Sequence, residues 1–318
     1  MDEKTEPRLN PKQLLKNGYL KICAPMVRYS KLPFRQLVRD YNVDLCYTPM
    51  ILADVFKHSQ MSRQAEFTTN FKDDPVIVQF AANNGTDAAD AAELIAKYSN
   101  GVDINCGCPQ PWAIGEKIGS YLLSQPETVK DIVDQVKRRT SSVKMQDGSS
   151  FPCSIKIRIH EDLNETVELC KRAEAVGVDW ITVHGRLKKQ KNHEPVNLDA
   201  LKIMKESVNV PLFTNGGIYN LKEANAMMEY TKADGVMVAT GLLQNPALFS
   251  GYDYTPIECV EKFINYSVGY GSNHFIFHHH LMFMLENVMS RAEKQNFNAL
   301  YSIPGVIDYL KDHYGILQ

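Results

Sequence analysis

An amide and a thiol stand where an apolar run of the chain gives way to a turn rich in glycine and proline. The run covers residues 101–104, and Asn105 and Cys108 come after it. In enzymes built from repeated strand, loop and helix units, the carboxyl ends of the strands face the ligand. Asn105 and Cys108 are therefore candidates for substrate contact. A free cysteine is also commonly a small buried hydrophobe, so the segment by itself leaves both interpretations of Cys108 open.

Other short apolar runs end in small or polar residues in the same manner, which makes eight in all. The eight runs cover residues 21–24, 44–48, 76–80, 102–105, 154–158, 180–184, 212–215 and 235–239. Each suits a strand that is buried on both faces. Between them, residues 87–98 and 164–176 predict helices, and Ser124 and Asn220 are expected to cap two more, each with a glutamate three residues later. Eight strands alternating with helices predict an α/β fold, a TIM barrel rather than an open doubly wound sheet.

The character of the chain changes after Gly251. Residues 255–258 predict a helix start with proline in the first turn. An apolar stripe at helical spacing follows, which core packing explains more simply than a cofactor site does. The stripe consists of Phe277, Leu281, Met284, Leu285 and Val288. We therefore expect the barrel over residues 1–251 and an all-helical domain over residues 252–318.

Polar residues recur at the predicted strand ends, as expected of a binding site. They are Gln79, Asn105, Lys156, Arg158, His184, Asn215 and the terminal residues 239–241. Lys156 lies inside an apolar run, and lysine is almost never buried unpaired, so an anionic ligand or an internal ion pair is expected there. Residues 215–218 and 239–241 follow the seventh and eighth strands, where TIM barrels commonly bind phosphate through backbone N–H groups.

Histidines occur in two settings. His184 and Arg186 place a hydrogen-bonding ring and a fixed cation at the end of the sixth strand. The run at residues 278–280, with His274 one helical turn earlier, is explained by packing and solvent exposure, because no cysteine lies beside it. Cys106 and Cys108 have the wrong spacing for a zinc hook. No metal is expected.

The composition of this 318-residue chain is that of an ordinary globular protein, with 44% hydrophobic and 23% charged residues and a net charge of −2. Contact with a nucleic acid would need a local basic patch, since the whole chain has no basic excess. Seven cysteines and an acidic, polar N-terminus favour a reducing compartment, either cytoplasmic or nuclear. No apolar run approaches the roughly 20 residues that span a bilayer, so no membrane segment is expected.

In order and spacing, these motifs resemble those of the tRNA-dihydrouridine synthases. The matching segments are residues 24–26, Gln79 and residues 105–110, 155–158, 184–186 and 215–216, and they run across nearly the whole predicted barrel. Residues 22–30 and 297–300 are most similar to the eukaryotic synthase 4 and 4-like branch. This family joins an FMN-binding TIM barrel to a helical tRNA-binding domain, the architecture expected above.

The resemblance implies roles for individual residues. Those implied for FMN are Pro25, Met26 and Val27 along the flavin, Gln79, Lys156 and His184 at its ring or ribityl chain, and Asn215, Gly216, Gly217, Ala239 and Thr240 at its phosphate. Those implied for the tRNA substrate are Asn105, Arg186, Arg291 and Lys294. A lysine near the pyrimidine part of a flavin makes physical sense, because reduced flavin carries negative charge there.

The implied reaction is the reduction of the C5–C6 double bond of a D-loop uridine, with positions 20a and 20b expected. NADPH or NADH would reduce FMN, the flavin would give a hydride to C6, and Cys108 would protonate C5. The nicotinamide would bind only transiently, since no Gly-x-Gly-x-x-Gly fingerprint accompanies a strand. The enzyme is expected to be a monomer that binds tRNA.

Two positions depart from the family pattern, which has an acidic residue in place of Gly217 and an arginine in place of Thr240. Both lie in the implied phosphate site, where charged side chains and backbone amides can each hold the anion. Three alternatives stay open at this point: an FMN oxidoreductase of a small pyrimidine, a flavin-deficient tRNA-binding homologue, which these two departures suggest, and a Schiff-base aldolase that uses Lys156, which the barrel alone permits.

Overall fold

The computed structural model describes residues 7–316, in which parallel strands form a closed barrel. The strands are β1 (Leu20–Cys23), β2 (Leu45–Tyr47), β3 (Ile51–Leu52), β4 (Val76–Ala81), β5 (Val102–Cys106), β6 (Cys153–Ile159), β7 (Trp180–Leu187), β8 (Leu212–Asn215) and β9 (Gly235–Val238). Neighbours follow the order β2-β1-β9-β8-β7-β6-β5-β4, and β2 pairs with β4 to close the ring. The two-residue β3 pairs with the end of β4. The eight predicted strands and the TIM barrel are confirmed.

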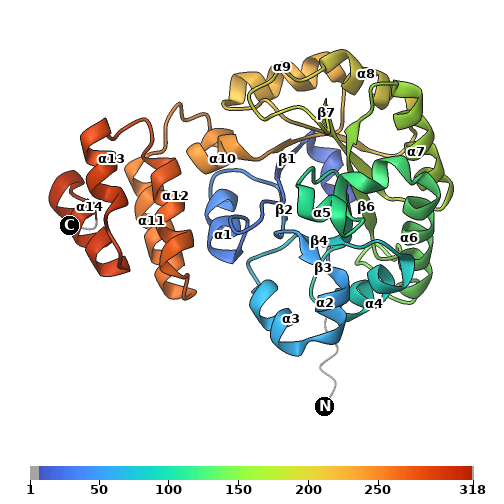
Figure 1. Ribbon diagram of the computed structural model, residues 1–318, viewed down its shortest axis with the longest axis horizontal. Helices are drawn as coiled ribbons and strands as arrows, with labels where there is room; N and C mark the ends of the chain where they lie inside the picture. The colour runs from blue at the N-terminus through green and yellow to red at the C-terminus, as the bar shows by residue number, and fades with distance from the viewer. Residues whose placement is uncertain (1–6, 317–318) are drawn as a thin grey trace.

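Helices surround the barrel, as Figure 1 shows. They are α1 (Leu32–Arg39), α2 (Ala53–His58), α3 (Gln60–Glu66), α4 (Gly85–Ile95), α5 (Pro111–Gly115), α6 (Pro126–Arg139), α7 (Leu163–Ala175), α8 (Leu198–Ser207), α9 (Leu221–Thr231) and α10 (Thr240–Gln244), with 3-10 helices η1 (Pro11–Asn17), η2 (Gly119–Ser124) and η3 (Leu248–Ser250). The predicted helices at 87–98 and 164–176 are α4 and α7. Apolar side chains of strands and helices form one large core, and Ala81, Ala113 and Ile118 form a small separate cluster.

One of the two predicted helix caps is confirmed and the other is wrong. The side chain of Asn220 accepts a hydrogen bond from the Glu223 N–H at the start of α9. Ser124 instead ends η2, and its hydroxyl donates to the carbonyl of Tyr121. Helix α6 begins two residues later at Pro126, which has no backbone N–H to satisfy at this position.

Four helices follow Gly251 in the described chain; the first packs against α1, the second packs against α10, and the last two lie farther from the barrel (Figure 1). They are α11 (Ile257–Gly269), α12 (His274–Met284), α13 (Arg291–Asn298) and α14 (Ile303–Tyr314). The predicted stripe is buried with one exception, since Val288 is 52% exposed. The stripe fails there because α12 ends at Met284, so helical spacing no longer applies. The division of the chain at residues 251 and 252 stays a prediction.

The histidines of α12 join this helix to its neighbours. His280 stacks on Phe34 of α1 with ring centroids 4.6 Å apart, and its Nε2 hydrogen-bonds the carbonyl of Tyr29. His278 stacks on Phe297 and hydrogen-bonds the carbonyl of the same residue. Burial lowers the pKa of His280 to about 3, so its ring is neutral. These two rings thus help to fasten the C-terminal helices to the barrel and to each other.

No three His, Cys, Asp or Glu side chains among residues 7–316 stand close enough to share a metal ion. None of the helices in this range is long and apolar enough to traverse a bilayer.

Candidate active site

A pocket opens at the carboxyl ends of the strands, between the loop after β1 and the turns after β7, β8 and β9. The predicted cofactor residues that line it are Pro25, Lys156, His184, Asn215, Gly216, Gly217, Ala239 and Thr240. The structure therefore brings together residues that are far apart in the sequence, as expected of strand ends in a barrel. Arg186, which was expected to meet the tRNA, lines the same pocket.

Three predicted cofactor residues do not line the pocket. Met26 and Val27 follow Pro25 in the same loop, where Met26 is buried and Val27 is exposed. Gln79 is buried in the barrel, where its amide contacts other protein groups. Their contacts with a flavin stay predictions.

Strand register places the polar residues of the site side by side. The facing pairs are Gln79 with Asp103, Asn105 with Lys156, Arg158 with His184 and His184 with Asn215. Because adjacent strands lie about 4.8 Å apart, each such pair can make direct contact or share a ligand.

A chain of hydrogen bonds leads from a buried carboxylate to the loop that carries Cys108. The hydroxyl of Ser154 donates to Asp103 Oδ1 at 2.6 Å, and Gln79 Nε2 donates to Asp103 Oδ2 at 2.7 Å. Asn105 Nδ2 then donates to Gln79 Oε1 at 2.8 Å. Asn105 Oδ1 in turn accepts from the N–H groups of Gly107 and Cys108. Asn105 thus shapes the cysteine loop.

The same loop is held on its other side. Arg158 Nε donates to the carbonyl of Gly107 at 3.1 Å, and the Ser120 N–H donates to the carbonyl of Cys108 at 2.9 Å. Gly119 packs so closely that a Cβ there would lie 2.7 Å from that carbonyl oxygen. All the cysteines except Cys108 are buried, so its thiol is the one placed to react with a substrate.

Positive charge accumulates around the pocket. Burial, and after it the nearby Arg158, lower the pKa of Lys156 to about 8. The Lys156 ammonium makes no hydrogen bond or ion pair with residues 7–316, so the expected anionic ligand is favoured over an internal pair. Burial and the cations Lys156, Arg158 and Arg186 lower the pKa of His184 to about 2, so this ring is neutral. Its Nδ1 is buried without a partner in the described chain.

A glycine turn after β8 forms the opposite wall. Gly216 and Gly217 have φ values of +112° and +71°, in the range that favours glycine. A Cβ on Gly216 would lie 3.0 Å from His184 Cε1. The N–H groups of Gly217 and Ile218 donate to no acceptor within the described residues. This turn therefore presents free backbone donors to an anion in the pocket.

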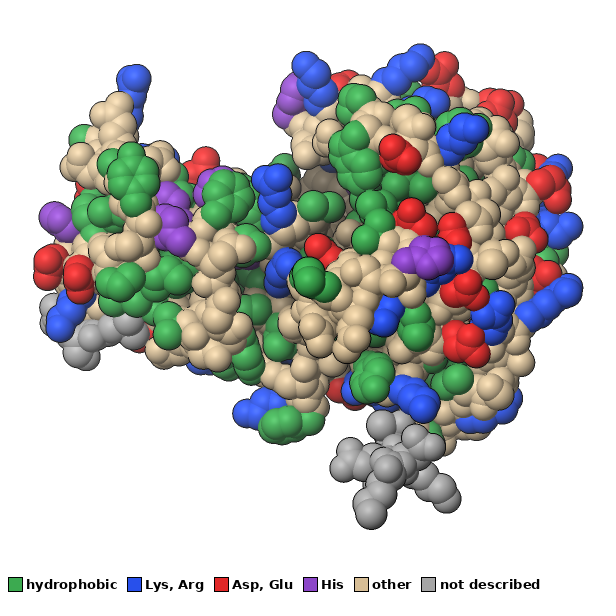
Figure 2. Space-filling model, turned by 60° about the horizontal axis from the view of Figure 1, so that its bottom comes forward, with side chains coloured by type: hydrophobic (Ala, Val, Ile, Leu, Met, Phe, Trp, Pro, Cys, Tyr) green, Lys and Arg blue, Asp and Glu red, His purple; other side chains and the backbone are tan. Residues whose placement is uncertain are grey.

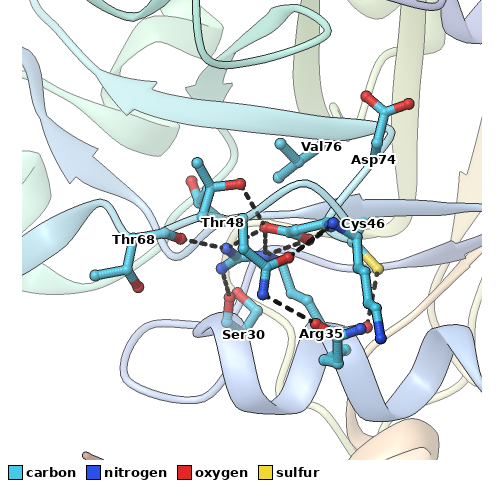
Figure 3. Close-up of polar contacts among 12 residues, drawn as sticks. Ser30, Arg35, Cys46, Thr48, Thr68, Asp74 and Val76 are labelled. Atoms are coloured by element: carbon cyan, nitrogen blue, oxygen red, sulfur yellow. Dashed lines mark hydrogen bonds and ion pairs between the residues drawn. The ribbon is translucent and has the colours of Figure 1, made fainter. Parts of the chain in front are cut away.

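A buried ion pair supports the loop after β1. Arg35 Nη2 lies 2.6 Å from Asp73 Oδ2, and the guanidinium also donates to the carbonyls of Ser30 and Thr68 at 2.7 Å each (Figure 3). The Ser30 hydroxyl accepts from the Met26 N–H at 2.9 Å. Burial alone would raise the pKa of Asp73, but Arg35 and a second arginine outweigh it and hold the pKa below its ordinary value.

The two predicted RNA contacts of the C-terminal region lie elsewhere. Arg291 is exposed and Lys294 half-buried on α13, which Figure 1 shows well away from the barrel. Sequence reasoning missed the supporting roles of Asp103 and Arg35. A usable signal existed for Asp103, because a charged residue inside a run predicted to be buried on both faces requires partners.

Comparisons with known proteins point to one family. Residues 22–304 match the family model described as Dihydrouridine synthase (Dus). A Homo sapiens protein named as tRNA-dihydrouridine(20a/20b) synthase NAD(P)+-like is 51% identical over 312 residues, covering 98% of this chain and 96% of that protein. The Schizosaccharomyces pombe tRNA-dihydrouridine(20a/20b) synthase, also named for NAD(P)+, is 45% identical over 293 residues, covering 92% of this chain and 87% of that protein.

A solved structure shows the same fold. The old yellow enzyme homologue from Zymomonas mobilis superposes with a TM-score of 0.50 and 9% identity, over 71% of this chain and 86% of that one. At this identity the likeness concerns the fold alone. The family model and the two relatives, which span nearly the whole chain, confirm the resemblance drawn from the motifs: the chain belongs to the dihydrouridine synthase family.

Proposed function

We propose that this chain reduces the C5–C6 double bond of uridines 20a and 20b in tRNA, with FMN as its flavin and NADPH or NADH as reductant. The relatives named for positions 20a and 20b support the substrate, because they align over most of both chains. The observation that carries the proposal is the partly exposed Cys108, held in a fixed loop three residues after Asn105, which pairs with Lys156 across β5 and β6. Lys156 lines the pocket and has no hydrogen-bond or ion-pair partner among residues 7–316, so a proton donor lies on the strand next to the one that carries an available cation.

The residues present fit FMN. Among residues 7–316, Lys156 has no anionic partner, His184 has a buried ring nitrogen without a hydrogen bond, and the N–H groups of the Gly217 turn have no acceptor. Lys156 and His184 would hold the ring system, and the turns after β8 and β9, with Asn215, Ala239 and Thr240, would surround the phosphate. When bound, the flavin supplies the hydride that reduces the uracil ring.

The chain's own groups supply the rest of the chemistry. The Cys108 thiol holds the proton that C5 receives, because an ordinary thiol is largely protonated at neutral pH yet acidic enough to act. The Lys156 ammonium would stabilise the negative charge that reduced flavin carries on its pyrimidine part. The side-chain oxygen of Asn105 accepts hydrogen bonds from the cysteine loop, and its Nδ2 donates one hydrogen bond to Gln79. The second N–H of this amide would be available to bind the uracil.

The tRNA must present an extruded base, since a stacked uridine cannot reach the pocket. Figure 2 shows a concave face between the barrel and the C-terminal helices, with lysine and arginine side chains beside it. Residues 252–318 carry four Lys or Arg against seven Asp or Glu, so binding there depends on local cations such as Arg291 and Lys294. We further propose that the protein acts as a monomer, that it is located in the cytoplasm or nucleus, and that it uses no metal ion.

The test begins with the visible spectrum of the purified protein. We expect flavin bands that bleach with NADPH under anaerobic conditions and return when unmodified tRNA is added. Mass spectrometry of the tRNA should locate dihydrouridine at positions 20a and 20b. Cys108→Ala should form little dihydrouridine, whereas Cys106→Ala, a change at a buried thiol, should remain active. Protein that takes up no added FMN, or a fully active Cys108→Ala variant, would refute the proposal.

A further inference from the structure

We propose that Arg186 supplies the cation that holds the phosphate of the flavin in this chain. The inference rests on the proposed use of FMN. Arg186 was expected to contact tRNA, but it is only 5% exposed and lines the flavin pocket together with Gly217, Tyr219 and Thr240. A side chain so placed is poorly suited to meet a large RNA and well suited to meet a ligand inside the pocket.

The Arg186 guanidinium is held at one end and free at the other. Its Nε donates to the carbonyl of Glu194 at 2.5 Å, which fixes the orientation of the group. Its two Nη groups donate to no acceptor among residues 7–316. The Glu194 carboxylate accepts from the Lys191 N–H instead, and no carboxylate of the described chain forms an ion pair with Arg186.

A buried guanidinium with two unused donor groups is unfavourable unless an anion completes it. Arginine binds phosphate oxygens through two parallel N–H bonds, and this geometry leaves Nη1 and Nη2 available for such contacts. The free N–H groups of Gly217 and Ile218 belong to the same wall of the pocket. Together these donors form a site for a phosphate group.

The identity of residue 217 explains why Arg186 is free. A Cβ on Gly217 would lie 3.9 Å from Arg186 Nη2, so an acidic side chain at this position would stand beside the guanidinium. Glycine at 217 removes that competing anion. Thr240 carries no charge either. The cations that line the pocket are therefore Lys156 and Arg186, and it is Arg186 that lies beside the Gly217 turn.

The first experiment compares FMN with riboflavin, which lacks the phosphate. Dissociation constants would be measured by flavin fluorescence on flavin-stripped protein. We expect wild type to prefer FMN at least ten-fold, Arg186→Gln to lose most of that preference with riboflavin affinity unchanged, and Arg186→Lys to keep part of it. Lys188→Gln, a change at an exposed cation two residues away, serves as the matched control and should behave as wild type.

Other outcomes would overturn the assignment. Equal weakening of FMN and riboflavin in Arg186→Gln would show that Arg186 only supports the fold of the pocket. If Arg186→Gln leaves FMN affinity unchanged and weakens tRNA binding, Arg186 contacts the tRNA and not the flavin phosphate. A wild type that binds both flavins equally well has no phosphate site, and one that binds neither would end both this inference and the proposed use of FMN.

A second experiment changes the charge beside Arg186 without touching it. Aspartate and asparagine have nearly the same size and both tolerate the left-handed backbone of residue 217. We expect Gly217→Asp to weaken FMN binding at least ten-fold more than Gly217→Asn, with riboflavin binding equal in the two. Equal FMN affinities would overturn the inference. Dihydrouridine formation by wild type at saturating FMN tests the proposed function separately, since it can fail while the phosphate preference persists.

Discussion

Asp103 provides the sharpest test of how the barrel supports the cysteine loop. Its carboxylate is fully buried and accepts from Ser154 and Gln79. Burial raises its pKa from 3.8 to about 6, against the opposing effects of these hydrogen bonds and of Lys156. The ionised form is therefore less favourable in the folded chain than in the unfolded one, although the hydrogen bonds lower that penalty.

The sign and size of the effect follow from linkage. A raised carboxyl pKa means that the folded state binds the proton more tightly, so the stability that this group contributes is fully present below pH 4. It is lost as the pH rises through 6. A shift of this size corresponds to about 3 kcal/mol at 1.36 kcal/mol per pKa unit. Solvent does not screen this value, because the side chain is inaccessible.

Asp103→Asn removes the ionisable group but can keep hydrogen bonds to both Gln79 and Ser154. The new Oδ1 can accept from Gln79 while the new amide N–H donates to Ser154, whose hydroxyl can rotate. We expect the free energy of unfolding of this variant, relative to wild type, to rise by about 3 kcal/mol between pH 4 and pH 7. Asp103→Ala leaves the Gln79 Nε2 donor without its acceptor, which costs about 1–3 kcal/mol and loosens the loop of Cys108.

Urea unfolding at several pH values measures the first effect, and dihydrouridine formation measures the second. Asp103→Asn should remain active, whereas Asp103→Ala should lose kcat with little change in flavin affinity, since Asp103 is a positioning residue that does not line the pocket. A difference between Asp103→Asn and wild type that does not vary with pH would refute the reasoning about its ionisation. An Asp103→Ala variant with full kcat would refute its role in placing Cys108.

Three further predictions address the rest of the site. Arg35→Met should lower the free energy of unfolding by about 3 kcal/mol at pH 7, because it leaves the buried Asp73 carboxylate with only its longer, 3.2 Å ion pair to Arg39; a loss below about 1 kcal/mol in urea unfolding would contradict this. Wild-type kcat/KM for NADPH should decline above pH 8 as Lys156 loses its charge, whereas Lys156→Arg should remove that decline from the pH–rate profile. Gly216→Ala should release flavin on gel filtration because its Cβ would crowd His184, and retained flavin would count against the turn as part of the site.

Part of the site could be read from local sequence alone. The apolar run around Ile104 indicates a strand, because burial on both faces favours apolar residues. The glycine and proline that follow Asn105 mark the change to a turn within six positions. The glycines at 216 and 217 were recognisable because few other residues adopt the backbone that the turn requires. The Asn220 cap likewise depends on groups within one helical turn.

Tertiary structure decided what depends on contacts between distant segments. Ser124 has the composition of a cap, yet the chain before α6 forms η2 and uses its hydroxyl elsewhere. Val288 continues a helical pattern past the end of the helix that carried it. In both cases the local sequence pattern predicted a helical feature, but the helix begins or ends at a different residue because packing with distant segments sets the path of the chain.

The site shows the same division most clearly. Burial pattern and motif order were enough to predict the barrel, the family and the strand ends that carry Cys108, Lys156 and His184. The hydrogen-bond chain from Asp103 to the cysteine loop and the position of Arg186 at the pocket became visible only in the folded chain. The physical reason is that strand register selects which side chains meet across the barrel, and register depends on pairings between residues that are tens of positions apart.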